Sequence, residues 1–151
     1  MKTTIVKTPG SVNKAAAARI LNVKPSQIKE VRVLESKNVV LVVGKGWATF
    51  VSFNAFSLDF VALRVRGAES VKVDATAFYD LDFLGMYDAS SDNWKTLHRV
   101  THRSYDGYPS RCTCEDYHFH SESNNNHRCK HIIAVDNWIR SLSQSRVFAH
   151  A

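Results

Sequence analysis

Residues that can coordinate a metal are confined to the last third of the chain. The chain has 151 residues, with three cysteines and seven histidines, and every one of these lies at or after His98. One residue separates Cys112 from Cys114, and one residue separates Cys129 from His131. Thiolates and imidazoles are the usual protein ligands of zinc. This segregation predicts an ordinary globular portion followed by a metal-binding portion.

The close spacing within each pair lets both side chains reach one ion. Alternate residues of an extended strand point to the same face, so Cys112 and Cys114 can offer both sulfurs at a strand end. Cys129 and His131 can do the same at the start of a helix. Three sulfurs and one imidazole complete a tetrahedral zinc site and leave no position for a catalytic water. We therefore predict a structural Zn²⁺, and the small, odd number of cysteines argues against a disulfide framework.

The fourth ligand has an alternative. His127 stands two residues before Cys129 and can replace His131. We favour His131 because its spacing from Cys129 mirrors the spacing of the first pair. The remaining histidines between the pairs, His118 and His120, are interpreted as part of a solvated polar loop.

The segments around the pairs predict two strands and a helix. Residues 96–104 and 110–114 are expected to be strands on either side of Asp-Gly-Tyr-Pro at 106–109, a strong turn signal. Apolar residues recur with helical spacing from Lys130 to residue 142, which predicts an amphipathic helix that buries Trp138. The helix would follow the second ligand pair directly.

Cys-x-Cys, a variable insert and Cys-x-His before an apolar helix resemble the SWIM-type zinc finger. The resemblance rests on the four ligands named above and on residues 132–135, and it covers roughly residues 95–142. It implies a ββα zinc module that binds DNA or contacts protein partners. Members of this family occur in transposases, chromatin-remodelling ATPases and recombination-associated complexes.

An alanine-rich segment, residues 11–21, predicts the first helix of the chain. Ser11 or Asn13 can cap its start, and Asn22 can end it because asparagine tolerates left-handed geometry. The segment after Pro25 has two interpretations. Either Ile28, Val31 and Leu34 form the apolar stripe of a second helix, which would make residues 18–45 a helix-turn-helix with a wing, or residues 31–34 form a strand of a small sheet on which the first helix packs.

A β-hairpin is predicted next. Residues 39–43 are rich in β-branched side chains, Gly44-Lys45-Gly46 turns the chain, and residues 47–53 return. Residues 54–66 fit a helix capped by Asn54 better than they fit a strand. A further strand is expected to begin at residue 71.

The expected fold class is α+β, divided by composition. The polar, turn-rich stretch at residues 88–93 is the best boundary candidate. We predict a helix-plus-sheet N-terminal domain at residues 1–90, the ββα SWIM-like zinc module at residues 91–142, and a C-terminal tail at residues 143–151.

Basic residues concentrate in the first third of the chain. Residues 1–45 carry nine Lys or Arg against two acidic residues, a net +7, whereas residues 46–91 carry −3 and residues 92–151 carry +2. A phosphate-facing surface and a solvated helix face both explain this pattern. The candidate nucleic-acid contacts are Lys14, Arg19, Lys24, Lys29, Lys45, Arg99, Arg103, Arg111, Arg128 and Lys130.

These patterns favour a binding protein over an enzyme. No nucleotide-binding loop, nucleophile elbow or dinucleotide fingerprint is present. The longest aliphatic run, residues 39–43, is too short to span a bilayer, so we expect a cytoplasmic or nuclear protein. We expect it to bind nucleic acid, DNA rather than RNA, in regulation, recombination or a mobile element, and to have no small-molecule substrate. The alternative is an adaptor that docks a partner ATPase or recombinase.

Overall fold

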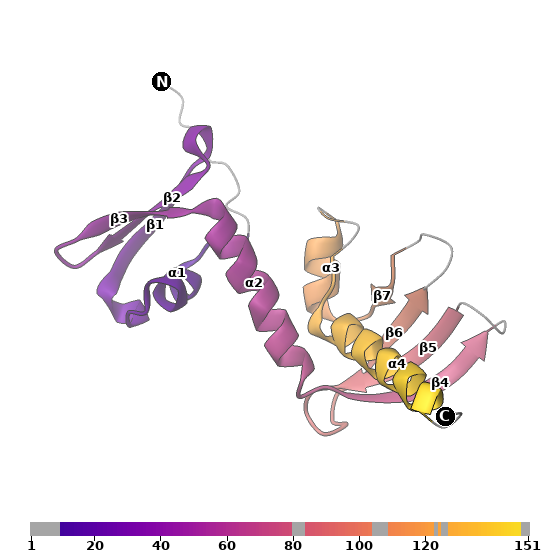
Figure 1. The fold of residues 1–151 in the computed structure, drawn as a ribbon. Coiled ribbons are helices and arrows are strands. Elements are labelled where there is room, and N and C mark those ends of the chain that lie inside the picture. The colour runs from indigo at the N-terminus through magenta and orange to yellow at the C-terminus, as the bar shows by residue number, and fades with distance from the viewer. Residues whose placement is uncertain (1–9, 80–83, 104–108, 123, 125–126, 149–151) are drawn as a thin grey trace. The chain divides into compact units, whose positions relative to one another are not determined.

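The computed structural model describes residues 10–79, 84–103, 109–122, 124 and 127–148. The chain divides into two compact units, Met1–Leu63 and Arg64–Ala151. The first unit contains α1 (Lys14–Leu21), β1 (Ile28–Leu34), β2 (Val39–Gly44), β3 (Ala48–Ser52) and the start of α2 (Phe53–Ala68), with short 3-10 turns at Pro25–Gln27 and Glu35–Lys37 (Figure 1). The second unit contains β4 (Lys72–Tyr79), β5 (Leu84–Ser90), β6 (His98–Arg103), β7 (Arg111–Cys112), α3 (Glu115–Ser121) and α4 (Lys130–Phe148). The α+β fold class is confirmed.

The first helix begins and ends as its sequence predicts. The Asn13 side chain accepts a hydrogen bond from the Ala16 backbone nitrogen at 2.9 Å, which satisfies one free donor of the first turn. At the other end, Asn22 adopts left-handed geometry with φ of 53°. Asparagine tolerates this conformation better than most residues, so the helix stops there.

Residues 28–34 form strand β1, and the helix-turn-helix interpretation is wrong. The strand pairs antiparallel with β2, and β2 pairs antiparallel with β3. Val31 and Val33 alternate with polar residues and face Val42 and Val40 across the ladder. These β-branched side chains suit a pleated surface better than a helix. The predicted hairpin is confirmed, and Gly46 takes the positive φ of 85° in its turn.

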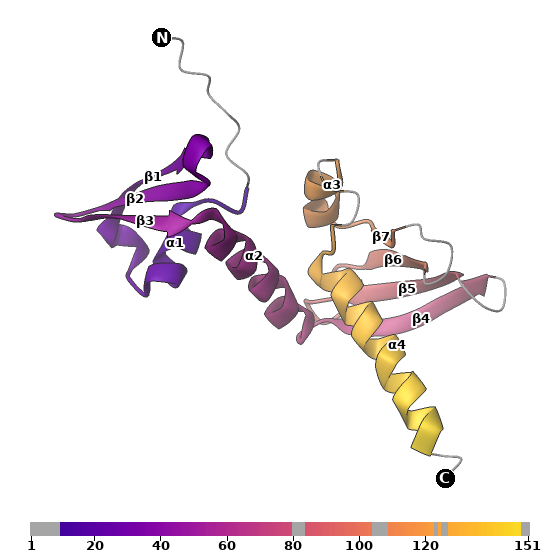
Figure 2. The same ribbon diagram turned by 45° about the horizontal axis from the view of Figure 1, so that its top comes forward.

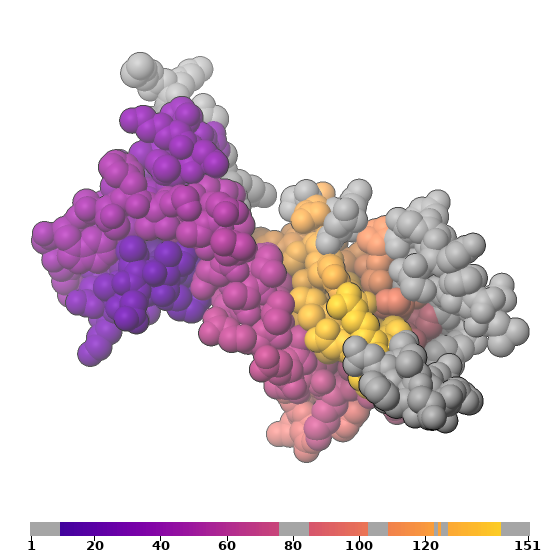
Figure 3. Space-filling model, viewed as in Figure 1, coloured from indigo at the N-terminus to yellow at the C-terminus, as the bar shows by residue number. Residues whose placement is uncertain are grey.

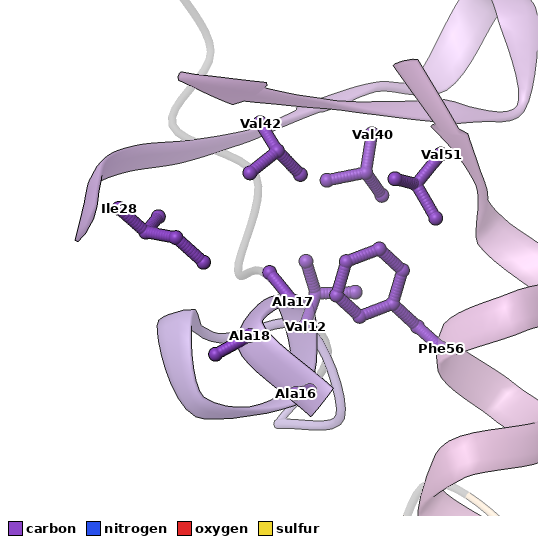
Figure 4. Packing of buried hydrophobic residues seen from close by; sticks show 9 residues of the cluster. All are labelled: Val12, Ala16, Ala17, Ala18, Ile28, Val40, Val42, Val51 and Phe56. Carbon is purple, nitrogen blue, oxygen red and sulfur yellow. The ribbon is translucent and has the colours of Figure 1, made fainter. Parts of the chain in front are cut away.

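One face of this sheet forms the core of the first unit. Val40, Val42 and Val51 point from the strands toward the alanines of α1, and Phe56 reaches the same cluster from α2 (Figure 4). Phe56 and the two β2 valines are fully buried. Small alanine side chains let the helix backbone approach the sheet closely, so this short helix contributes to a dense core.

Helix α2 confirms the predicted helix over residues 54–66, but it starts earlier. Strand β3 runs directly into the helix, and the Ser52 hydroxyl accepts a hydrogen bond from the Ala55 backbone nitrogen at 3.2 Å. Ser52 therefore takes the capping position expected of Asn54. No loop separates strand from helix, which explains the shift.

The second unit is a four-stranded antiparallel meander covered by α4. Its strands pair in the order β4-β5-β6-β7. In both ribbon views α4 crosses one face of this sheet (Figure 2). Strands β4 and β5 thus belong to the same sheet as the metal-binding segment. The boundary between the two units lies at residues 63 and 64 and not in the polar stretch at residues 88–93. That stretch ends strand β5 and begins its connection to β6, which polar composition alone does not distinguish from a linker.

Helix α4 is longer than its apolar pattern predicts. It continues to Phe148, so most of the expected tail at residues 143–151 is helical backbone. The predicted turn at residues 106–109 lies largely outside the described residues. No helix within the described residues has the length and apolar character needed to cross a membrane.

Candidate metal centre

The structure brings the two ligand pairs together in one buried cluster. The ligand atoms of Cys112, Cys114, Cys129 and His131 all lie within 4.8 Å of one another, and all four residues are buried. Thr113, between the first two, is exposed. The alternation places both sulfurs on the inner side of the chain, as the spacing of the pair predicts.

Two helix starts hold three of the four ligands. The Cys114 sulfur accepts a hydrogen bond from the Tyr117 backbone nitrogen at 3.4 Å and caps α3. The Cys129 carbonyl accepts from the Ile133 nitrogen at 3.1 Å, so Cys129 stands at the entry of α4 and His131 in its first turn. A helix start fixes backbone direction, and each ligand side chain is therefore held by regular structure.

The dimensions of the cluster fit zinc. Zn–S bonds of about 2.3 Å and Zn–N bonds of about 2.0 Å place tetrahedral ligand atoms about 3.5–3.8 Å apart. Cys112 Sγ lies 3.9 Å from His131 Nδ1. His131 Nε2 is buried without a hydrogen-bond partner among the described residues. Nδ1 is the nitrogen beside the Cys112 sulfur, so it is the atom of His131 suited to bind the ion.

The thiols polarise one another. The hydrogen bond between the Cys112 and Cys114 side chains lowers the pKa of Cys114 and raises the pKa of Cys112. Cys114 is thus the sulfur that carries negative charge most readily. Zinc binds cysteine as thiolate, so metal loading deprotonates the remaining thiols and releases protons.

His127, the alternative fourth ligand, lies outside this cluster. Its Nε2 is 3.4 Å from an Asp116 carboxylate oxygen, and its ring lies 4.9 Å from that of His120. Arg64 also binds the Asp116 carboxylate. His127 is therefore buried by a polar network around Asp116, and the structure selects His131 for the metal cluster.

Helix α3, which carries Asp116, replaces part of the expected solvated loop. Its first turn contains Glu115 and Asp116, and its last turn contains His118 and His120. Acidic residues at a helix start are favourable because of the helix dipole. The two acidic residues after Cys114 are the feature of the sequence that could have predicted this helix. The helix is hard to recognise because cysteine is an uncommon N-cap residue. His118 is exposed, as expected of a solvated residue.

The metal ligands are continuous with the apolar core of the second unit. Cys112, Cys114 and Cys129 belong to the same buried cluster as Val100 and Ile132. Trp138 packs against this cluster, as its place on the apolar stripe predicts, and its ring lies 5.6 Å from that of Tyr87. The metal site is therefore one end of the core of this unit.

The candidate nucleic-acid contacts divide into paired and unpaired cations. Arg19 binds Asp59 at 2.7 Å, Arg99 binds Asp88 at 3.4 Å, and Arg128 binds Asp136. Five of the candidates are exposed and form no ion pair within the described part of the chain: Lys14, Lys24, Lys29, Lys45 and Arg111. Lys130 donates to the Ser91 hydroxyl at 3.0 Å. The Arg103 side chain lies outside the described residues.

A closed, buried set of three cysteines and one histidine at two helix starts defines a structural zinc module. Residues 98–135 match the model of the SWIM zinc finger family. The chain therefore carries a SWIM zinc finger, and the resemblance inferred from its ligand spacing is confirmed. No curated protein and no solved structure gives a significant match to the chain.

Proposed function

We propose that the chain is a non-catalytic nucleic-acid-binding protein, with DNA its ligand, acting in regulation, recombination or a mobile element. The SWIM finger supports this proposal as a module of DNA or protein interaction. The four protein ligands fill a tetrahedral zinc shell, so no position is open for substrate or catalytic water. The metal would then stabilise the fold and take no part in a reaction.

The observation that carries the proposal is an unpaired cation beside the zinc ligands. Arg111 precedes the ligand Cys112 on β7, is exposed, and forms no ion pair with any described residue. An arginine held this way keeps its whole charge for a phosphate, whereas Arg99 and Arg128 are partly neutralised by carboxylates. Lys95 and Arg140 are also exposed in the same unit.

A protein-docking function is the second candidate, and α2 carries the observation that favours it. Leu58 and Val61 are 61% and 55% exposed, although Phe56 on the same helix is fully buried. Figure 3 shows atoms of α2 at the surface along the helix. Apolar side chains on the outer face of a helix can serve as anchors for a partner.

One titration separates the two candidates. Zinc-loaded protein is added to labelled duplex DNA, single-stranded DNA and RNA, and anisotropy is measured over a series of salt concentrations. A nucleic-acid binder loses affinity linearly on a log–log scale, with a slope of about 0.9 per phosphate neutralised on duplex DNA. We expect Arg111→Gln to reduce that slope by about one such contact.

Arg32→Gln is the matched control, because Arg32 is an exposed arginine already paired with Glu30 at 2.7 Å. Its slope should equal that of the wild type. Absence of binding to all three nucleic acids at low salt would reject the proposal and leave the docking function.

A further inference from the structure

The connection between β5 and β6 presents an aromatic ring from an unfavourable backbone conformation. Trp94 has φ of 68°, in the left-handed region, and Asn93 before it has φ of 58°. Asparagine is tolerated there, but a bulky residue is an outlier. The Trp94 side chain is 40% exposed, so burial of the ring does not account for the strain. Strained residues of this kind concentrate at functional sites.

Hydrogen bonds inside the connection hold this conformation. The Ser90 hydroxyl is fully buried, donates to the Asp92 carboxylate at 2.8 Å and accepts from the Trp94 backbone nitrogen at 3.0 Å. The same carboxylate accepts from the Thr96 backbone nitrogen at 2.9 Å. Hydrogen bonds from the Thr96 side chain and backbone, and then from Ser90, lower the pKa of Asp92 to about 2. The ring is therefore presented by a built loop.

Two lysines from other elements contact this loop, and a third lies within it. Lys72 on β4 donates to the Asn93 side chain at 2.7 Å, and Lys130 on α4 donates to the Ser91 hydroxyl at 3.0 Å. Lys95 follows Trp94 directly and is exposed. None of the three forms an ion pair with a described residue. Asp92 contributes the one carboxylate of the loop, so the lysines leave a net positive charge around the ring.

We propose that residues 90–97 bind an unpaired base of single-stranded nucleic acid, with the base stacked on Trp94 and phosphates bound by Lys72, Lys95 and Lys130. The inference rests on the proposed function and names its substrate class. Aromatic rings beside cations are the usual means of binding single strands, whereas the faces of duplex bases are covered by their neighbours. Lysine is depleted in protein interfaces, so three lysines disfavour a protein partner at this loop.

The test compares single strands with duplex DNA on zinc-loaded full-length protein. We expect Trp94→Ala and Trp94→Leu to weaken binding to an oligothymidylate by about 5- to 150-fold, the range of one stacked base. Binding to a duplex should change less than about twofold. Trp94→Phe retains a ring and should keep most of the affinity. Lys72→Gln and Lys95→Gln should each reduce the salt slope by about 0.7.

Leu97→Ala is the control, because Leu97 is 56% exposed on the same loop but has no aromatic face. Zinc content and far-ultraviolet circular dichroism check the fold of each variant. Quenching of wild-type tryptophan fluorescence by oligothymidylate, absent in Trp94→Phe, supports stacking without relying on a destabilised variant.

The outcomes distinguish this inference from the proposed function. If the wild type binds no nucleic acid, the proposed function fails and the stacking site fails with it. If the wild type binds while Trp94→Ala and Trp94→Leu bind single strands equally well, the stacking site alone is rejected. Equal losses on single strands and duplex would also overturn it, because stacking requires an unpaired base.

Discussion

Replacing the zinc ligand Cys129 by serine should unfold the second unit and leave the first unit folded. Cys129 is fully buried and stands at the entry of α4, the helix that covers the sheet. Removing its sulfur breaks a closed ligand set and leaves three buried ligands without a complete shell. The α4 start then loses the contact that ties it to β7.

The expected loss of stability follows from the position of the metal site in the core of the second unit. Structural zinc supplies apparent free energies on the order of 10 kcal/mol, whereas whole domains are stable by about 5–15 kcal/mol. The three cysteines belong to the main buried cluster of the second unit, so loss of the metal disrupts the same core that its apolar residues form. Loss of zinc should therefore exceed the stability of that unit.

The first unit has its own core around Val40, Val42 and Phe56 and contains none of the ligands. It should keep its fold in Cys129→Ser and in the presence of a chelator. Amide-resolved NMR spectra of the zinc-loaded wild type and of the variant report the folding of both units in one sample. The expected spectrum keeps dispersed signals for residues 10–63 and loses them for the second unit. A variant that retained stoichiometric zinc and wild-type thermal stability would refute the reasoning.

Three further changes probe other parts of the structure. His127→Gln should keep stoichiometric zinc and lose only about 1 kcal/mol through its contact with Asp116, and zinc loss on this substitution would reinstate His127 as a ligand. Phe56→Ala should destabilise the first unit by about 3–5 kcal/mol in denaturant unfolding, with zinc content unchanged. Trp94→Gly should be more stable than Trp94→Ala by about 1 kcal/mol in thermal unfolding, because glycine accepts positive φ; equal stabilities would contradict the strain.

The ligand set could be predicted from sequence because its information is local. One-residue spacing within each pair fixes which side chains share a face, whatever the rest of the fold does. The choice of His131 over His127 needed the structure, because both lie two residues from Cys129. Only the position of Asp116 on α3 shows where the His127 ring is held.

The limits of prediction lie in long-range pairing. Residues 28–34 suited both a helix and a strand, and pairing with β2 decided between them. The polar residues 88–93 resembled a linker, but residues 88–90 are the end of β5, which pairs with β6. The setting of Trp94 was missed for the same reason, because its lysine neighbours come from β4 and α4.

The zinc site and the Trp94 loop are connected through the first turn of α4. Lys130 lies between the ligands Cys129 and His131, and its ammonium group reaches Ser91 of the loop. His98, at the start of β6, lies with its ring 4.4 Å from that of His131. Because zinc loss should unfold the second unit, it should also release Lys130 and the loop that Lys130 contacts. Single-strand affinity should therefore fall with zinc content in a chelator titration, and affinity that survived complete zinc loss would separate the stacking loop from the metal.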